Sequence, residues 1–187
     1  MVACIAIVHA VSLASSCSRP PEPARETPPP GIVECVPAPS STAPDSKTLT
    51  ELRRAAEASP LFQAASARRA LVSCEVTSQT SLLTLIFRFS DKTSFTIGRD
   101  PQIEYTSQEV AFAQPLADDA STILKRGERE AFGADGCGID WSAAQTEPSA
   151  DGVSSDRVFR GDVCQCQARI RRDRTGRVIG LLFRSTC

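Results

Sequence analysis

The sequence predicts an α+β fold: a mainly antiparallel sheet with N-terminal helices and one later helix packed on it. Helical patterns fill the stretch from 48 to 65 and the stretch from 118 to 132, and strand patterns fill most of the remaining domain. Helices that come in separate runs from the strands are typical of this class. Eight cysteines in 187 residues further indicate a disulfide-stabilised fold if the chain is exported.

Two short helices are expected at the start of the domain. Thr48 and Glu51 have the spacing of a capping box, in which each side chain bonds the backbone of the other residue. Ser59-Pro60 ends this helix and begins the next, because serine is a good N-cap and proline is tolerated at the first helical position. The apolar positions of both helices are mostly alanine, so shallow faces are expected to lie flat on a sheet.

A run of strands is expected after the helices. Residues 72–77 alternate apolar and polar side chains, which is the pattern of a half-buried strand. The strand that follows presents the most apolar face of the chain. After a turn, Phe95 and Ile97 are expected to lie on the same face as Phe87 and Phe89. One or two further short strands are expected before residue 113.

A single later helix is expected from Asp118-Asp119 to about Phe132, with Gly133 as its stop. Its apolar side includes Gly127, where the missing side chain predicts close packing. The stretch after this helix is loop-like, with Trp141 as its anchoring side chain. No stretch of the sequence repeats another.

A C-terminal β-hairpin closes the predicted domain. Its first strand covers residues 158–171, its turn 173–176 and its second strand 177–187. A turn of four residues places Cys187 one pair beyond Cys164. A turn of two residues places Cys187 directly opposite Cys164, and both registers remain open.

The N-terminus points to export. Residues 2–13 form an uncharged, mostly apolar run, too short to span a bilayer as a helix and of the length of a signal-peptide core. Small residues then lead directly into Cys17. This arrangement resembles the lipobox of bacterial lipoproteins, in which the cysteine is lipidated and becomes the first mature residue. The resemblance implies a signal peptide over residues 1–16, a lipid anchor on Cys17 and a place in the cell envelope, as an outer-membrane lipoprotein facing the periplasm or the cell surface.

A tether and one domain follow this anchor. Residues 17–46 are rich in proline and poor in apolar side chains, so they are expected to stay extended and solvated. Residues 47–187 are expected to form a single α+β domain, which is long enough to bury a core. The formal net charge of −1 predicts no general attraction to nucleic acid.

Six cysteines remain after export and lipidation, and in an oxidising compartment they are expected to form structural disulfides. Both registers of the hairpin favour a bond between Cys164 and Cys187. Cys166 is then expected to reach Cys74 on the opposing strand. That leaves two cysteines for each other, namely Cys35 and Cys137. The alternative is redox or metal chemistry at Cys164-Gln165-Cys166, which the position in a strand disfavours.

Arginines cluster on the predicted hairpin. These side chains could contact an acidic protein or an anionic envelope component, and the candidate contact residues are Arg169, Arg171, Arg172, Arg174 and Arg177. The alternative is a solvated strand face whose acids lie nearby. A nucleic-acid partner is not expected, because interleaved aromatic residues are missing.

Catalytic chemistry has little support in the sequence. The single histidine, His9, lies in the predicted signal peptide, so Ser-His-Asp and Cys-His catalysis and His-ligated zinc sites are excluded from the mature chain. Asp135 and Asp140 lack the alternation of an EF-hand loop. No catalytic residue, metal ligand or cofactor is therefore predicted.

The expected function is non-catalytic binding or structure in the cell envelope. A second hypothesis is a periplasmic inhibitor or immunity-like protein, which needs a rigid scaffold and no catalytic groups. A third is a carboxylate-dependent enzyme, since acids need only meet in space.

Overall fold

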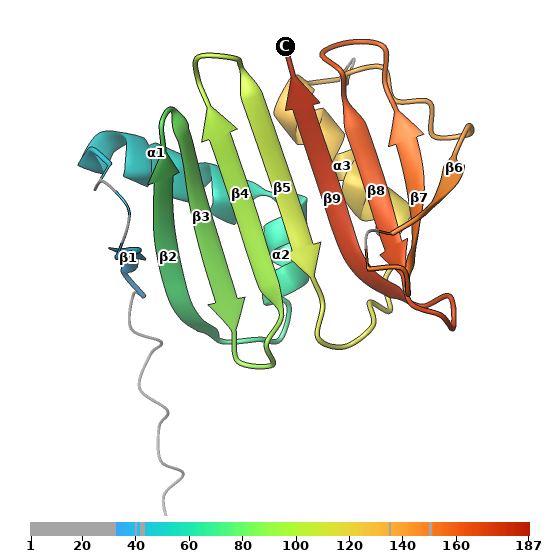
Figure 1. The fold of residues 1–187 in the computed structure, drawn as a ribbon, viewed down its shortest axis with the longest axis horizontal. Coiled ribbons are helices and arrows are strands. Elements are labelled where there is room, and N and C mark those ends of the chain that lie inside the picture. The colour runs from blue at the N-terminus through green and yellow to red at the C-terminus, as the bar shows by residue number, and fades with distance from the viewer. Residues whose placement is uncertain (1–32, 40, 42–43, 135, 150) are drawn as a thin grey trace, which may run out of the picture.

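The protein is described by a computed structural model that covers residues 33–187 except 40, 42–43, 135 and 150. The predicted signal peptide, Cys17 and most of the predicted tether lie outside the described residues. The described chain forms one sheet in the order β1-β2-β3-β4-β5-β9-β8-β7-β6, with helices over one face (Figure 1). Every pairing is antiparallel except that of β1 with β2. The predicted α+β class with a mainly antiparallel sheet is therefore confirmed.

The elements of the described chain follow in this order: β1 (Cys35–Pro37), α1 (Ser46–Ala58), α2 (Pro60–Ser66), β2 (Leu71–Gln79), β3 (Leu82–Phe89), β4 (Ser94–Asp100), β5 (Tyr105–Ala111), α3 (Ala120–Phe132), β6 (Gln145–Pro148), β7 (Ser155–Arg160), β8 (Gln167–Arg172) and β9 (Val178–Thr186).

Side-chain caps set the starts of the helices. Helix α1 begins earlier than the predicted capping box, because Asp45 accepts a hydrogen bond of 2.9 Å from the backbone N–H of Thr48. Ser59 caps α2 as predicted, by accepting from the backbone N–H of Leu61. Asp119 caps α3, which ends at Gly133, where φ is 81°. Such a positive φ favours glycine.

The order of the elements repeats, although the sequence shows no repeat. Helix α2 leads into the four-strand meander β2–β5, and α3 leads into the meander β6–β9. The last strands of the two meanders, β5 and β9, pair antiparallel in the middle of the sheet. A half-turn about an axis through this pair, perpendicular to the sheet, thus exchanges the two halves of the topology. The repeat escapes sequence comparison because different side chains fill equivalent positions in the two halves.

The core lies between the sheet and the helices. The ring of Phe62 on α2 meets Phe87, Phe89 and Phe95 edge-on, with centroids 5.1–5.7 Å apart. Phe87 and Phe95 thus share the buried face of the sheet, as the sequence predicts. A Cβ added to Gly127 would lie 3.0 Å from Leu61, so α2 and α3 pack closely there.

The C-terminal region differs from the predicted hairpin. Its predicted first strand is two strands, β7 and β8, because the chain leaves the sheet after Gly161 and re-enters it at Gln167. Strands β8 and β9 do form a hairpin, and a bulge at Arg171/Arg172 shifts its register. Beyond this bulge Ile170 lies opposite Leu181, which is the register that the two-residue turn predicts.

Strand β1 lies in the predicted tether. It pairs parallel with β2, and Cys35 lies opposite Cys74 in this pairing. The sheet therefore includes residues that composition assigns to the tether. A three-residue strand that lacks an apolar alternation gives no strand signal in the sequence.

Candidate functional site

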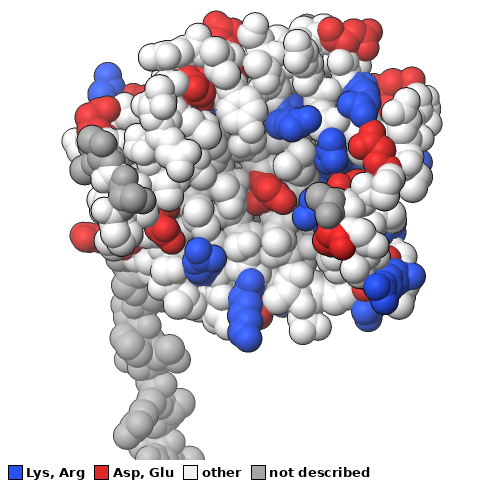
Figure 2. Space-filling view, in the orientation of Figure 1, with Lys and Arg blue, Asp and Glu red and all other residues white. Residues whose placement is uncertain are grey.

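The face of the sheet that carries no helix presents side chains from neighbouring strands that could act together. In β4, β5, β8 and β9, side chains alternate between the core and this open face. We define the open face by the following side chains and their neighbours in register: Thr96, Glu109, Gln167, Arg169, Arg171, Leu182 and Arg184. Figure 2 shows charged side chains gathered over β8 and β9, whereas the surface over β3 and β4 is mostly uncharged.

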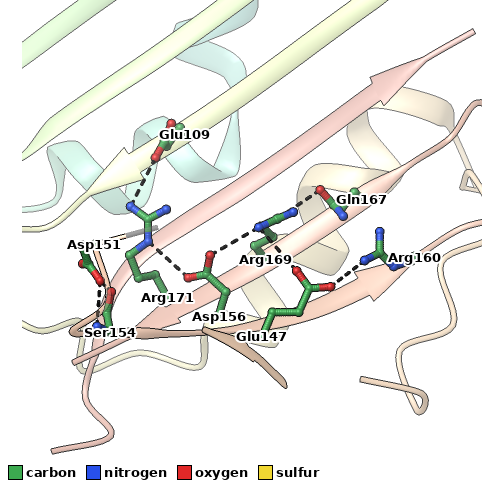
Figure 3. Close-up of polar contacts among 9 residues, drawn as sticks. All are labelled: Glu109, Glu147, Asp151, Ser154, Asp156, Arg160, Gln167, Arg169 and Arg171. Carbon is green, nitrogen blue, oxygen red and sulfur yellow. Dashed lines mark hydrogen bonds and ion pairs between the residues drawn. The ribbon is translucent and has the colours of Figure 1, made fainter. Parts of the chain in front are cut away.

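A buried carboxylate organises the charged part of this face. The side chain of Asp156 on β7 is only 3% exposed, and two arginines of β8 approach it. Arg171 Nε lies 3.2 Å from one carboxylate oxygen and Arg169 Nη1 lies 3.4 Å from the other (Figure 3). The burial of Asp156 is therefore compensated by two cations, as a buried charge requires.

The network extends to both sides of Asp156. Arg171 reaches across β9 to Glu109 on β5 at 3.9 Å, and Arg169 lies 3.8 Å from Glu147 on β6 (Figure 3). Arg160 closes the row with a contact of 2.6 Å to Glu147. Three arginines and three carboxylates, contributed by β5, β6, β7 and β8, thus alternate in a row, and their formal charges cancel. We call these six side chains the ion-pair network.

Register and a glycine make this arrangement possible. Asp156 lies opposite Arg171 in the β7–β8 pairing, and Gly180 lies opposite Arg171 in the β8–β9 pairing. A Cβ on Gly180 would come within 3.4 Å of the Arg171 Cβ and 3.2 Å of a backbone oxygen of Val110. The missing side chain therefore lets Arg171 extend over β9 toward β5.

The arginines predicted as partner contacts do not form one surface. Arg169 and Arg171 belong to the ion-pair network, whereas the other three lie at or near the β8–β9 turn. Arg172 donates to the carbonyl oxygen of Gly176 at 2.7 Å, and Arg177 pairs with Asp173 at 3.0 Å. An acidic partner would have to compete with these internal contacts at four of the five arginines.

The turn itself is built around Asp173. Its carboxylate accepts hydrogen bonds from the hydroxyl of Thr175 and from the backbone N–H groups of Thr175 and Arg177. The hydroxyl bond from Thr175, followed by these backbone bonds, lowers the pKa of Asp173 to about 2. The carboxylate thus orders the turn that carries Arg174.

Arg172 and Arg177 also lie near the two acids that precede α3. They line, with Asp118 and Asp119, a hollow of about 500 Å³ beside the start of this helix. The rim of the hollow therefore carries both signs of charge and is not a basic patch. Asp119 caps the helix, and the hydroxyl of Thr122 is the main cause that lowers its pKa.

Glu128 on α3 is a buried acid that was not among the residues predicted from the sequence. One carboxylate oxygen accepts from the backbone N–H groups of Cys137 and Ile139 at 3.0 and 3.3 Å, and the other accepts from the indole N–H of Trp141 at 2.8 Å. These bonds fold the loop after α3 onto the helix. The available signal was a glutamate on the apolar side of the predicted helix, next to Gly127.

Asp140, another acid named from the sequence, orders its own loop. Asp140 accepts from both the hydroxyl and the backbone N–H of Ser142, and the hydroxyl bond is the main cause that lowers its pKa. Asp135 lies outside the described residues. Within the described ranges, no group of three or more His, Cys, Asp or Glu side chains is placed to hold a metal ion.

All six predicted cysteines form disulfides, and the predicted bond between Cys164 and Cys187 is confirmed. The predicted bonds Cys74–Cys166 and Cys35–Cys137 are wrong, because the pairs are Cys35–Cys74 and Cys137–Cys166. Strand β1 brings Cys35 to Cys74 at the sheet edge, while Glu128 draws the Cys137 loop toward Cys166. The three bonds indicate an oxidising compartment outside the cytoplasm.

Among the helices of the described chain, none has the length and apolar character needed to cross a bilayer. Comparison of the chain with protein-family models, with curated proteins and with solved structures found no match. The site must therefore be interpreted from its own geometry.

Proposed function

We propose that this protein is an exported, lipid-anchored envelope protein whose domain binds another protein, without catalysis, through the open face of its sheet. The observation that carries the proposal is the ion-pair network: six charged side chains are fixed in a row on a face that no helix covers. Its arginines are held in place before any partner arrives.

Such preorganisation favours binding to another protein. A side chain that is already held in one conformation loses little entropy on association, which is a major cost for flexible arginines. Arginine is also enriched at protein interfaces. Asp156 contacts only one nitrogen of each of Arg169 and Arg171. Because a guanidinium has five N–H donors, both side chains can still donate hydrogen bonds to a partner.

The open face is complementary to a partner surface that has one acidic side chain surrounded by neutral polar side chains. Arg184 on β9 is exposed between Ser107 on β5 and Gln167 on β8, and among the described residues no carboxylate lies within ion-pair distance of it. Beside it, hydroxyl-bearing side chains of β3–β5 can exchange hydrogen bonds. We therefore assign the main contact with an acidic side chain of the partner to Arg184.

The anchor and the tether complete the proposal. Acylation of Cys17 would attach the chain to the membrane, stably if several acyl chains are present. The domain would then be held near the membrane surface by the proline-rich segment. A partner in the same compartment, such as an envelope protein, is the kind of molecule that this arrangement serves.

A pair of matched variants tests the binding face. Thr96→Arg places a long cation in the middle of the open face, and Thr50→Arg places the same side chain on an exposed position of α1. We expect a partner cross-linked to the wild-type protein in intact envelopes to be lost with Thr96→Arg and kept with Thr50→Arg. Equal recovery with both variants, each checked for its normal melting temperature, would refute the binding face.

A second pair tests the charge of the contact. Arg184→Glu reverses the charge on the open face, and Arg54→Glu makes the same change on exposed α1. The affinity for the purified partner should fall at least about tenfold with Arg184→Glu, as for loss of a charged interface contact. Unchanged affinity would remove Arg184 from the proposal while leaving the face in place.

The second candidate function is inhibition of an enzyme in the same compartment. It is favoured by the three disulfides and the fixed side chains of the open face, which together make a rigid surface of the kind that inhibitors present. If the partner is an enzyme, its activity should fall in proportion to added domain. An enzyme that stays active in the saturated complex would rule out inhibition.

A further inference from the structure

Two of the three disulfides could also form with their partners exchanged. The bonds Cys137–Cys166 and Cys164–Cys187 overlap along the chain, because Cys164 lies inside the loop that the other bond closes. Only Gln165 separates Cys164 from Cys166, so each of these two cysteines could bond either Cys137 or Cys187. Exchanging these two partners gives Cys137–Cys164 and Cys166–Cys187, two loops that follow one another without overlap.

Chain entropy does not distinguish the two pairings. The native loops span 29 and 23 residues, and each exchanged loop is shorter by two residues. The entropy of loop closure depends only on the logarithm of length, so both pairings cost nearly the same. A chain that emerges into an oxidising compartment from its N-terminus also exposes Cys164 to Cys137 before Cys166.

Only the folded structure separates the two cysteines. Cys164 and Gln165 both have positive φ, 53° and 42°, and this turn directs the two sulfur atoms to different partners. Cys166 and Cys137 are buried, at 2% and 0% exposure, whereas Cys164 is half-buried near the end of β9. In the exchanged pairing, Cys137 and Cys166 could not both keep their buried positions. If the exchanged bonds form before folding, they prevent the two side chains from reaching those positions.

We propose that Cys164-Gln165-Cys166 is a site of action for a thiol–disulfide isomerase, which this protein needs in order to reach its native pairing. The inference rests on the proposed export and lipidation. With the signal peptide removed and the Cys17 sulfur occupied by its lipid, a fully oxidised domain has no thiol of its own to begin disulfide exchange. An external thiolate must therefore supply it.

The exchange is balanced without any net oxidation. The isomerase thiolate attacks the Cys164 sulfur of the Cys137–Cys164 bond, which forms a mixed disulfide and releases the Cys137 thiolate. That thiolate attacks Cys166, which forms Cys137–Cys166 and releases the Cys187 thiolate. Attack of this thiolate on the mixed disulfide forms Cys164–Cys187 and returns the isomerase thiolate. Three bonds form, three break and no electrons are consumed.

Oxidation of the purified protein tests the pairing itself. The full lipidated chain, reduced and unfolded in detergent, is oxidised by a dithiol oxidase with or without a reduced disulfide isomerase, and the bonds are mapped by mass spectrometry. Because the loop costs of the two pairings are nearly equal, we expect the exchanged pairing to be about as abundant as the native pairing with oxidase alone. The isomerase should convert the exchanged molecules to the native pairing. Native pairing in nearly all molecules without the isomerase would overturn the proposal.

Two double variants supply the matched comparison in cells with and without an isomerase. Cys164→Ser with Cys187→Ser leaves two bonds that do not overlap, so its native yield should not depend on the isomerase. Cys35→Ser with Cys74→Ser keeps the overlapping pair and should remain dependent. Equal dependence of both variants would place the requirement outside Cys164-Gln165-Cys166 and refute the site.

Failure of the export proposal would give a different result. A chain that stays in the cytoplasm would show reduced cysteines and an intact N-terminus, whatever the isomerase level. The oxidation of the purified protein would still decide whether the two pairings compete, because it does not depend on export.

Discussion

Glu128 shows how one side chain can order a loop that has no regular structure. Two backbone N–H groups and the indole of Trp141 all donate to its carboxylate, which is 6% exposed as a residue. The same loop carries Cys137, so this carboxylate also helps to hold Cys137 at the position where it bonds Cys166. A buried acid whose oxygens are occupied in this way is a structural group.

Replacing this acid should be costly for stability. We expect Glu128→Ala to lower the free energy of unfolding by about 3 kcal/mol, because two buried backbone donors and the partly buried indole N–H of Trp141 lose a charged acceptor. Glu130→Ala, at an exposed position of the same helix, should change it by less than about 0.5 kcal/mol. Urea denaturation of both oxidised variants measures the difference. A loss at Glu128 no larger than that at Glu130 would contradict the role of the carboxylate.

At this scale the sequence predicted which cysteines bond but not all of the partners. The hairpin register was enough for Cys164 and Cys187, since both lie near one strand pair. The other two bonds depend on where β1 and the Glu128 loop lie, and both are set by contacts distant in sequence. Pattern and spacing carry no information about such contacts.

Strands and turns in this protein are shaped by charged groups as much as by apolar ones. Strand β8 places Arg169 and Arg171 on the open face, and their acids come from β5, β6 and β7. Composition alone could raise the possibility that acids lie nearby. It could not identify Asp156, because the predicted single strand from 158 to 171 hid the β7–β8 pairing that brings Asp156 to Arg171.

The β8–β9 turn should make stability depend on acid pH. The folded-state pKa of Asp173 is lowered to about 2, below the ordinary value of 3.8, so its ionised form stabilises the fold above pH 4. That stabilisation should disappear as the pH falls from about 4 to about 2. The melting temperature of the wild type should therefore exceed that of Asp173→Asn at pH 5, and the gap should narrow toward pH 2.

Two changes in the same turn sharpen this measurement. Thr175→Ala removes the hydroxyl that is the main cause of the low pKa, so the pH-dependent loss of stability should be smaller and should be complete at a higher pH. Arg174→Ala serves as the control, because the bonds to Asp173 come from Thr175 and Arg177. A gap between the wild type and Asp173→Asn that stays constant down to pH 2 would contradict the assignment.

As a whole, the described chain is a single sheet with helices on one side. At one edge, β1 is joined to β2 by the Cys35–Cys74 bond, and we call this disulfide-linked edge the clasp. The α+β class followed from the order of the sequence patterns, because the helical and the strand patterns come in separate runs along the chain. The pair of four-strand meanders could not be predicted from the sequence. Strand β6 is short and polar, and equivalent positions of β2–β5 and β6–β9 carry different residues. The sequence offered no means of choosing which face stays open.

The clasp at the sheet edge should contribute strongly to stability. Removing the Cys35–Cys74 bond by Cys35→Ser with Cys74→Ser opens a loop of 39 residues, and we expect a loss of about 4 kcal/mol. Amide exchange should rise at β1 and along β2, while β8 and β9 keep their protection. Uniform acceleration across the sheet would show that the edge and the centre open together.

The clasp also determines how the domain bears mechanical load. If the chain is pulled from the membrane side, tension reaches Cys35 and passes through a covalent bond into β2. The residues between Cys35 and Cys74, which include α1 and α2, are then shielded from the pull. Helices that would otherwise unravel first stay packed over the sheet, and the open face keeps its shape under tension.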